Sequence, residues 1–175
     1  MTQTTTIGRP AETEYMPYYG KYVSLVPGGE ILAILDQQSK ETLAQLRAIP
    51  EERGTFRYAP DKWSIKELLG HLIDSEIIFA YRALRFARND RTPLPGFEQD
   101  DYVRAGGFDA RPLSGLIEEL EMVRRATVLL FKHLPEEAWL RTGLANDSEV
   151  SVRALAYIIA GHERHHLNVL REKYL

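Results

Sequence analysis

Apolar side chains recur at helical spacing in four segments of the chain: residues 30–49, 64–89, 113–133 and 151 to about 170. In each segment they fall on one side of a helix, as an amphipathic helix of a globular core requires. We find no strand-like alternation and no internal repeat. The pattern therefore predicts an all-α domain, most simply a four-helix bundle.

Local signals place the ends of these helices. Ser64-Ile65-Lys66-Glu67 is a capping box, in which the serine oxygen and the glutamate side chain each accept from a backbone N–H. Ser151 is a plausible N-cap of the last helix, and Pro50 ends the first. Between the third and fourth helices we expect a short helical turn at 135–139 and a loop at 143–148.

Two irregular segments complete the predicted domain organisation. Residues 1–29 form an N-terminal arm rich in Pro, Gly and Tyr, and residues 30–175 form the bundle. The arm holds four tyrosines that we expect to pack against the body, with a ligand surface as the alternative; they are Tyr15, Tyr18, Tyr19 and Tyr22. Residues 90–112 form a long connection between helices two and three, and such connections are often functional.

Composition narrows the classes of function. The 175 residues include 22 Lys and Arg against 25 Asp and Glu, and this slight acidity argues against nucleic acid as the main partner. The chain has no cysteine, which excludes disulfides, a thiol nucleophile and thiolate metal sites. No apolar run is long enough to span a membrane, and no signal peptide is evident. We therefore expect a cytoplasmic protein with no membrane partner.

Three histidines carry the candidate chemistry. His162 and His166 stand four positions apart, so they lie on one helical face, about 6 Å apart along the axis. His71 lies on the core-facing stripe of the second helix. The three histidines lie at the same height along the bundle if the second and fourth helices run antiparallel. The long connection permits this, because it can cross the bundle and let the second and third helices run parallel. We therefore predict one metal site, with satisfied core histidines as the alternative.

Residues 162–166 also match the His-Glu-x-x-His spacing of zinc peptidases. Too few residues follow His166 to supply the third ligand that such a site needs downstream, so His71 is the better candidate. His165 points about 100° away from His166. His133 falls at a helix C-terminus, where a cation is favoured, and we interpret it as structural.

Three imidazoles would leave a divalent ion with open coordination positions. Such a site has a catalytic form, because structural zinc is closed by four protein ligands. The open position can take water, whose pKa the ion lowers, or a thiolate. Nitrogen ligands suit zinc, nickel, iron or copper, and of these we favour zinc or nickel, with iron as the alternative.

The chain resembles members of the DinB/YfiT-like superfamily of metalloenzymes. The resemblance rests on three stretches, namely residues 62–76 (KWSIKELLGHLIDSE), 94–97 (LPGF) and 161–166 (GHERHH). It implies a four-helix bundle, often dimeric, with one divalent metal held by His71, His162 and His166. Characterised members include metal-dependent transferases that use low-molecular-weight thiols, so the resemblance implies a thiolate transferred to an electrophilic small molecule.

Other polar residues are candidates for supporting roles. Asp74, Glu76, Asp100 or Asp101 could orient a metal ligand or move a proton, although each could equally be a surface charge or a helix cap. Arg82, Arg85 and Arg88 could bind an anionic cofactor, although a solvated face is the simpler interpretation. A hydrolase that uses metal-bound water and a non-catalytic stress protein with a stabilising metal remain alternatives. We also expect a homodimer.

Overall fold

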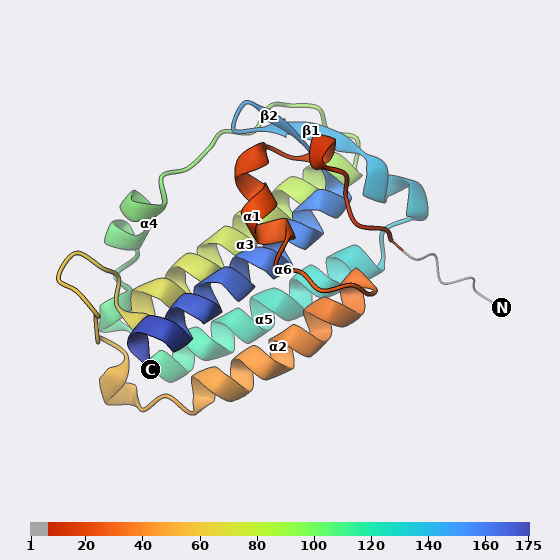
Figure 1. The fold of residues 1–175 in the computed structure, drawn as a ribbon. Coiled ribbons are helices and arrows are strands. Elements are labelled where there is room, and N and C mark those ends of the chain that lie inside the picture. The colour runs from red at the N-terminus through yellow and green to blue at the C-terminus, as the bar shows by residue number, and fades with distance from the viewer. Residues whose placement is uncertain (1–6) are drawn as a thin grey trace.

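The computed structural model describes residues 7–175 and is a four-helix bundle (Figure 1). Its long helices are α2 (Ile31–Arg47), α3 (Ile65–Ala87), α5 (Leu113–Lys132) and α6 (Val152–Val169). The predicted all-α class and the four helices are confirmed. Within the described part of the chain, no helix has the length and apolar character needed to cross a membrane.

The helices are connected in an uncommon order. α3 and α5 run parallel to each other, and α2 and α6 run in the opposite direction (Figure 1). α3 packs against both α5 and α6, and α2 packs chiefly against α5 and α6. The second and fourth long helices, α3 and α6, are thus antiparallel neighbours. The expected convergence of the three histidines depended on this arrangement. The long connection runs along the outside of the bundle and returns the chain to the end at which α3 began (Figure 1).

Both predicted caps are present. The Ser64 side chain accepts from the N–H of Glu67 at 3.0 Å, and the Glu67 carboxylate accepts from the N–H of Ser64 at 2.9 Å. Ser151 accepts from the N–H of Ala154 at 3.0 Å at the start of α6. These side chains satisfy N–H groups that a helix start leaves without partners. They fix where α3 and α6 begin, and hence the levels of the histidines that follow.

The apolar core falls into two clusters, one toward each end of the bundle. One cluster gathers residues of α3 from Phe79 onward with the first half of α6. The other gathers the first turns of α3 and α5 with the end of α6. Between them lies a layer of buried polar side chains, namely Gln38, Thr42, His71, Ser75, Glu76, Arg124, His162 and Glu163. His71 and His162 belong to this central layer, and the half-buried His166 lies one turn of α6 beyond His162.

The prediction of no strands is wrong. Strands β1 (Thr142–Ala145) and β2 (Ser148–Ser151) form an antiparallel hairpin where we expected a loop. Its turn residues Asn146 and Asp147 have φ of 53° and 59°, as the two central residues of a type I′ turn require. Strands this short leave too few positions for an alternation to be visible, and the Asn146-Asp147 pair is the local signal that favours the turn.

The two irregular segments also contain helices. The arm carries α1 (Gly20–Val23), which packs on α6, together with short 3-10 turns at Glu12–Glu14 and Pro17–Tyr19. The connection carries α4 (Gln99–Gly106) and a 3-10 turn at Phe108–Ala110. Further 3-10 turns lie at Glu51–Arg53 and Glu136–Leu140, and a π-helical turn ends the chain at Leu170–Tyr174. The turn at Glu136–Leu140 confirms the one expected there.

A carboxylate fastens the arm to the start of α6. Glu14 accepts from Arg153 Nε and from the Ser151 hydroxyl, both at 2.7 Å. Burial alone would raise the pKa of Glu14, but the hydrogen bonds from Arg153, the N–H of Ala11 and Ser151 outweigh it and lower the pKa to about 2. The ionised form is therefore the one that holds the arm in place.

We expect this attachment to be lost in acid. Because the folded-state pKa of Glu14 lies below its ordinary value, its contribution is fully present above about pH 4.5 and disappears as the pH falls toward 2. The difference in unfolding free energy between the wild type and Glu14→Gln should therefore be constant near neutrality and shrink across that window. Urea denaturation at a series of pH values measures it. A difference that does not change between pH 6 and pH 3 would contradict this assignment.

Candidate metal centre

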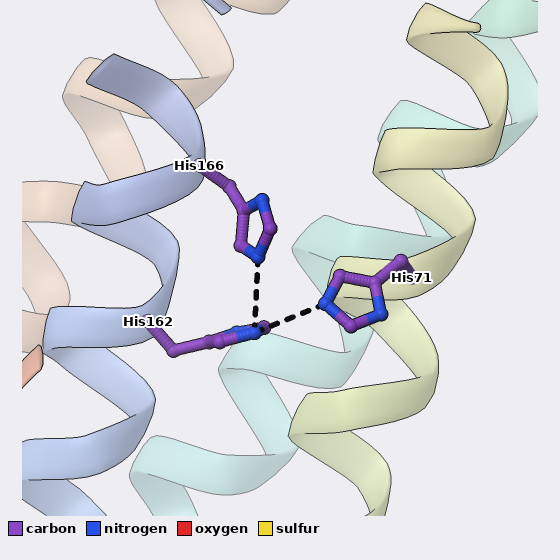
Figure 2. A group of neighbouring side chains, drawn as sticks. All are labelled: His71, His162 and His166. Carbon is purple, nitrogen blue, oxygen red and sulfur yellow. Dashed lines mark hydrogen bonds between the residues drawn. The ribbon is translucent and has the colours of Figure 1, made fainter. Parts of the chain in front are cut away.

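Three histidine side chains from two helices converge in the central polar layer. Nε2 of His162 lies 3.0 Å from Nε2 of His71 and 3.2 Å from Nε2 of His166 (Figure 2). One ligand atom from each ring lies within 4.8 Å of the others. His71 comes from α3, and the other two come from successive turns of α6. The structure thus brings together all three predicted ligands.

The surroundings keep these imidazoles neutral. His71 is 2% exposed and His162 is 7% exposed. Burial lowers the pKa of His71 to about 4, and burial together with the neighbouring histidines lowers the pKa of His166 to about 2. The same causes hold the pKa of His162 well below its ordinary value. Neutral imidazole is the form that binds a metal ion, so no proton has to leave at pH 7.

The donor set fits a divalent ion. With Zn–N distances of about 2.0–2.1 Å, two nitrogens of a tetrahedral site lie roughly 3.3 Å apart, close to the separations from His162. The Ser75 hydroxyl lies 3.4 Å from Nδ1 of His71. That placement suits a hydroxyl that accepts from the distal N–H of a metal ligand and so fixes its tautomer. In the described part of the chain, no fourth His, Asp or Glu joins the group.

An indole ring covers one side of the cluster. Trp63 lies just before the cap of α3, with its ring centroid 4.7 Å from that of His71 and 6.4 Å from that of His166. The Tyr174 hydroxyl donates to the Trp63 carbonyl at 2.7 Å, and burial raises the pKa of Tyr174 to about 12, so the hydroxyl keeps its proton. This ties the end of the chain to the segment that carries the indole.

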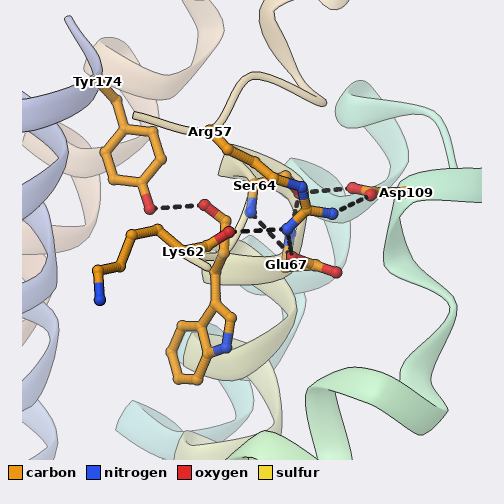
Figure 3. Close-up of polar contacts among 7 residues, drawn as sticks. Arg57, Lys62, Ser64, Glu67, Asp109 and Tyr174 are labelled. Atoms are coloured by element: carbon orange, nitrogen blue, oxygen red, sulfur yellow. Dashed lines mark hydrogen bonds and ion pairs between the residues drawn. The ribbon is translucent and has the colours of Figure 1, made fainter. Parts of the chain in front are cut away.

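Hydrogen bonds around the α3 cap fix the same segment from the other side. Figure 3 shows Arg57 donating to the Lys62 carbonyl at 2.9 Å, to Glu67 and, at 2.7 Å, to Asp109. Ser64 donates to the other oxygen of Asp109 at 2.5 Å. The connector before α3, the cap itself and the turn before α5 therefore hold the Trp63 backbone in one position.

A buried ionic group lies beside the histidines. Arg124 of α5 donates twice to Glu76 of α3, with both distances 2.8 Å, and also donates to Glu163 of α6. Thr42 of α2 donates to the other oxygen of Glu163. All four long helices thus meet in one network, in the layer that holds His162. Burial alone would lower the pKa of Arg124, but the two carboxylates raise it above its ordinary value.

Two cavities border the histidine cluster. The first, of about 360 Å³, is lined by His71, His162 and residues of the arm, α3, the hairpin turn and the connection. The second, of about 330 Å³, is lined by His165, His166, Trp63 and residues near the chain end. Asp100 borders both cavities. The metal position is thus approachable from two sides, and one exposed carboxylate stands between them.

The other predicted carboxylates have different surroundings. Asp101 pairs with Arg104 at 2.6 Å on the surface of α4. Asp74 lines neither cavity; burial and the charge of Glu119 raise its pKa, while Arg111 lowers it. Glu76 also lines neither cavity and is held by Arg124. Of these candidates, only Asp100 lies where it can reach a molecule bound at the cluster.

The predicted anion-binding arginines do not face the cluster. Arg82 is buried and donates to the Pro95 carbonyl at 2.9 Å, which fastens the connection to α3. Arg85 pairs with Asp90 and Tyr81, and Arg88 is exposed at the end of α3. None of the three lines either cavity beside the cluster, so the geometry gives them no role in binding a cofactor there.

The positions of His165 and His133 agree with those expected from the sequence. The ring of His165 is half-buried, 5.0 Å from that of His166 and 5.4 Å from that of Tyr22. His133 is the exposed C-cap residue of α5.

Sequence reasoning missed several residues of the site. Neither Trp63 nor Tyr22 was assigned to it, although the Tyr22 ring lies 5.2 Å from that of His162. Trp63 was given no role of its own, and Tyr22 was assigned to packing of the arm. Tyr22 is buried, as expected for packing. It also lines the first cavity, so it belongs at the same time to the ligand surface that we gave as the alternative.

Comparison with known proteins places this geometry in a family. The family model described as the DinB superfamily matches residues 34–170. The chain belongs to the DinB superfamily. The match includes all three histidines and the network around Arg124. It begins after the arm, so the arm tyrosines that line the first cavity (Tyr18, Tyr19 and Tyr22) lie outside the matched region.

Two similar proteins carry related descriptions. One, from Oceanobacillus iheyensis, is provisionally named a metal-dependent hydrolase; it is 27% identical over 124 residues, or 70% of each chain. The other is the structure of YfiT from Bacillus subtilis, described as a probable metal-dependent hydrolase with an unusual four-helix bundle topology. It superposes with a TM-score of 0.64 at 16% identity, over 94% of this chain and 90% of that one. That likeness supports the fold, and the histidine cluster fits a metal-binding DinB protein.

Proposed function

We propose that this protein is a metal-dependent hydrolase whose single divalent ion is held by His71, His162 and His166. The observation that supports it is the convergence of three neutral imidazoles beside a cavity, with no fourth protein ligand among residues 7–175. An ion with an open position polarises a carbonyl or phosphoryl oxygen and lowers the pKa of water. Three nitrogen ligands suit zinc or nickel, and iron is possible.

The chain's own residues supply the remaining functions. The Asp100 carboxylate borders both cavities and is exposed, so it can accept a proton from the attacking nucleophile. The Trp63 indole packs against His71 and His166 and forms part of the wall of the second cavity. The first cavity binds a small-molecule substrate, and its volume of about 360 Å³ is near the lower end of known ligand pockets, which span about 300–1,000 Å³.

Transfer of a low-molecular-weight thiol is the second candidate. The presence of two cavities at one cluster favours it, because a thiol and an electrophile could approach from different sides. The chain has no cysteine, so a small molecule would have to supply the thiol. Lys62 and His165 line the second cavity and could contact the acidic groups of such a molecule.

Metal content measured together with turnover tests the proposal. Zinc-reconstituted wild type should hold about one ion per chain by elemental analysis, and His71→Ala and His162→Ala should lose it. Asp100→Asn should keep the ion but hydrolyse a panel of activated esters about 10²–10⁴-fold more slowly. Asp101→Asn is the matched control, because the neighbouring carboxylate pairs with Arg104 on the surface and should leave the rate unchanged.

Three outcomes would count against hydrolysis. Full metal content in both histidine variants would remove the site. Turnover only after a thiol such as glutathione or bacillithiol is added would support transfer instead. A metal that raises the melting temperature without turnover in either condition would indicate a stabilising ion.

A further inference from the structure

We infer that the N-terminal arm forms a specificity subsite for a flat aromatic group of the substrate, next to the bond that reacts. The inference rests on the proposed function, because it places that group beside the open position of the metal. It makes Tyr18, Tyr19 and Tyr22 specificity-determining residues. The substrate class is accordingly small aryl-bearing esters or amides.

The lining of the first cavity combines residues inside and outside the region that the family model matches. His71, Ser75, Phe79 and His162 come from α3 and α6, within the matched family region. Met16 and the three tyrosines come from the arm, which precedes the region that the DinB family model matches. The tyrosine side of the cavity thus lies outside the matched family region, whereas the histidines lie inside it.

The arm tyrosines Tyr18, Tyr19 and Tyr22 form a continuous series of ring contacts that reaches the candidate metal ligand His162. The ring centroid of Tyr18 lies 5.4 Å from that of Tyr19 and 5.9 Å from that of Tyr22, and both pairs meet edge to face. Tyr19 continues to Phe79 at 6.1 Å, and Tyr22 continues to His162 at 5.2 Å. Edge-to-face contacts at these distances are favourable for aromatic rings. A flat ring bound here would extend the set directly beside His162.

The residues of the connection and the hairpin turn that line the first cavity also suit a small, flat ligand. Phe97 supplies another ring there, and the polar residues Glu98, Gln99, Asp100 and Asn146 stand at the exposed side. The ammonium of Lys21 lies 4.0 Å from the Tyr18 ring centroid and 4.8 Å from that of Tyr22, so it covers part of these rings. A volume of about 360 Å³ accommodates one aromatic ring with a short reactive group.

The arm is fixed well enough to present the three tyrosines. Gly161 lets the backbone of Tyr22 approach α6 so closely that a Cβ at residue 161 would overlap the Tyr22 carbonyl group. Arg9 donates to the carbonyl of Val23 at 2.7 Å and to that of Val26 at 2.5 Å, and Glu14 binds Arg153. A subsite held in advance loses little entropy on binding.

Two hydroxamates that differ by one phenyl ring test the subsite by binding alone. Acetohydroxamate and phenylacetohydroxamate share the same zinc-chelating group, so the ratio of their dissociation constants reports the contribution of the ring. Isothermal titration of the zinc-loaded protein should give a ratio of about ten or more in favour of the aryl compound, as burial of a phenyl ring predicts.

A matched pair of tyrosine variants shows whether the arm is responsible. Tyr18 is 54% exposed and lines the cavity, whereas Tyr81 is 48% exposed on α3 and lines neither cavity beside the cluster. Tyr18→Ala should lower the ratio about threefold or more, with acetohydroxamate binding unchanged. Tyr81→Ala should leave both dissociation constants unchanged. Because both side chains are exposed, neither variant should impair folding.

The possible failures are distinguishable. If acetohydroxamate binds but the phenyl ring adds nothing, the subsite does not exist while the proposed metal function stands. If the ring adds affinity and Tyr18→Ala and Tyr81→Ala behave alike, the arm does not supply the subsite. If neither hydroxamate binds the zinc-loaded protein, the open coordination position is absent, and the proposed function fails together with the inference.

Discussion

Replacing Arg124 with methionine is expected to lower the free energy of unfolding by about 3–5 kcal/mol. Arg124 holds the carboxylates of Glu76 and Glu163 in the buried central layer, and both are almost completely shielded from solvent. Methionine has a similar length but carries no charge. It would leave two buried carboxylates without a cation, and a charge buried without a partner is costly.

A control for this experiment stands next to it in the sequence. Arg125 is exposed on the same helix, so Arg125→Met should change the unfolding free energy by no more than about 0.5 kcal/mol. Adding Glu76→Gln and Glu163→Gln to Arg124→Met should restore part of the loss, because the uncompensated charges are then gone. Urea denaturation of the four proteins measures these differences. Equal stability of the two arginine variants would show that the network contributes little.

Gly161→Ala is expected to displace the arm and weaken binding in the first cavity. A methyl group at residue 161 would overlap the Tyr22 carbonyl, and backbone cannot yield as a flexible side-chain end can. Overpacking of this kind typically costs about 1–3 kcal/mol. We expect a lower melting temperature, faster amide exchange in residues 20–23, and a rise of about tenfold or more in the Kd of phenylacetohydroxamate, because burial of its ring is lost.

Gly115→Ala is the matched control. Gly115 lies in α5, and an added Cβ there meets nothing within 4 Å. Alanine in that helix should stabilise the protein by up to about 1 kcal/mol, because alanine has the higher helix propensity. If Gly161→Ala left amide exchange of the arm and hydroxamate binding as in the wild type, the close approach of the arm to α6 would not matter for the site.

Much of the fold followed from local signals in the sequence. The capping box at Ser64 and the N-cap at Ser151 depend on side chains within one helical turn, so they could be predicted without tertiary information. The same is true of the shared face of His162 and His166, which the helical period dictates. Placing His71 beside them needed one additional assumption about the direction of two helices.

The remaining parts depend on contacts between distant segments. Arg124 stands on the core-facing side of α5, but a pattern of apolar and polar residues counts an arginine as exposed, and its two partners belong to other helices. Tyr22 was assigned to packing and Trp63 was given no role, because nothing near either residue in the sequence indicates the histidines. Glu76 was proposed for proton transfer because its partner Arg124 could not be seen.

The order in which the helices are connected has a consequence for how the chain folds. In a simple up-and-down bundle, each helix can pair early with the next one along the chain. Here α3 and α5 are parallel neighbours, and α2 packs chiefly against α5 and α6 rather than against α3, the next long helix. The hydrogen bonds Gln38–Ala160 and Thr42–Glu163 join residues 122 and 121 positions apart. The central layer can therefore form only after most of the chain has been made and brought together. Because closing such long loops costs entropy before any contact is gained, folding should be slower than for most helical bundles of this size.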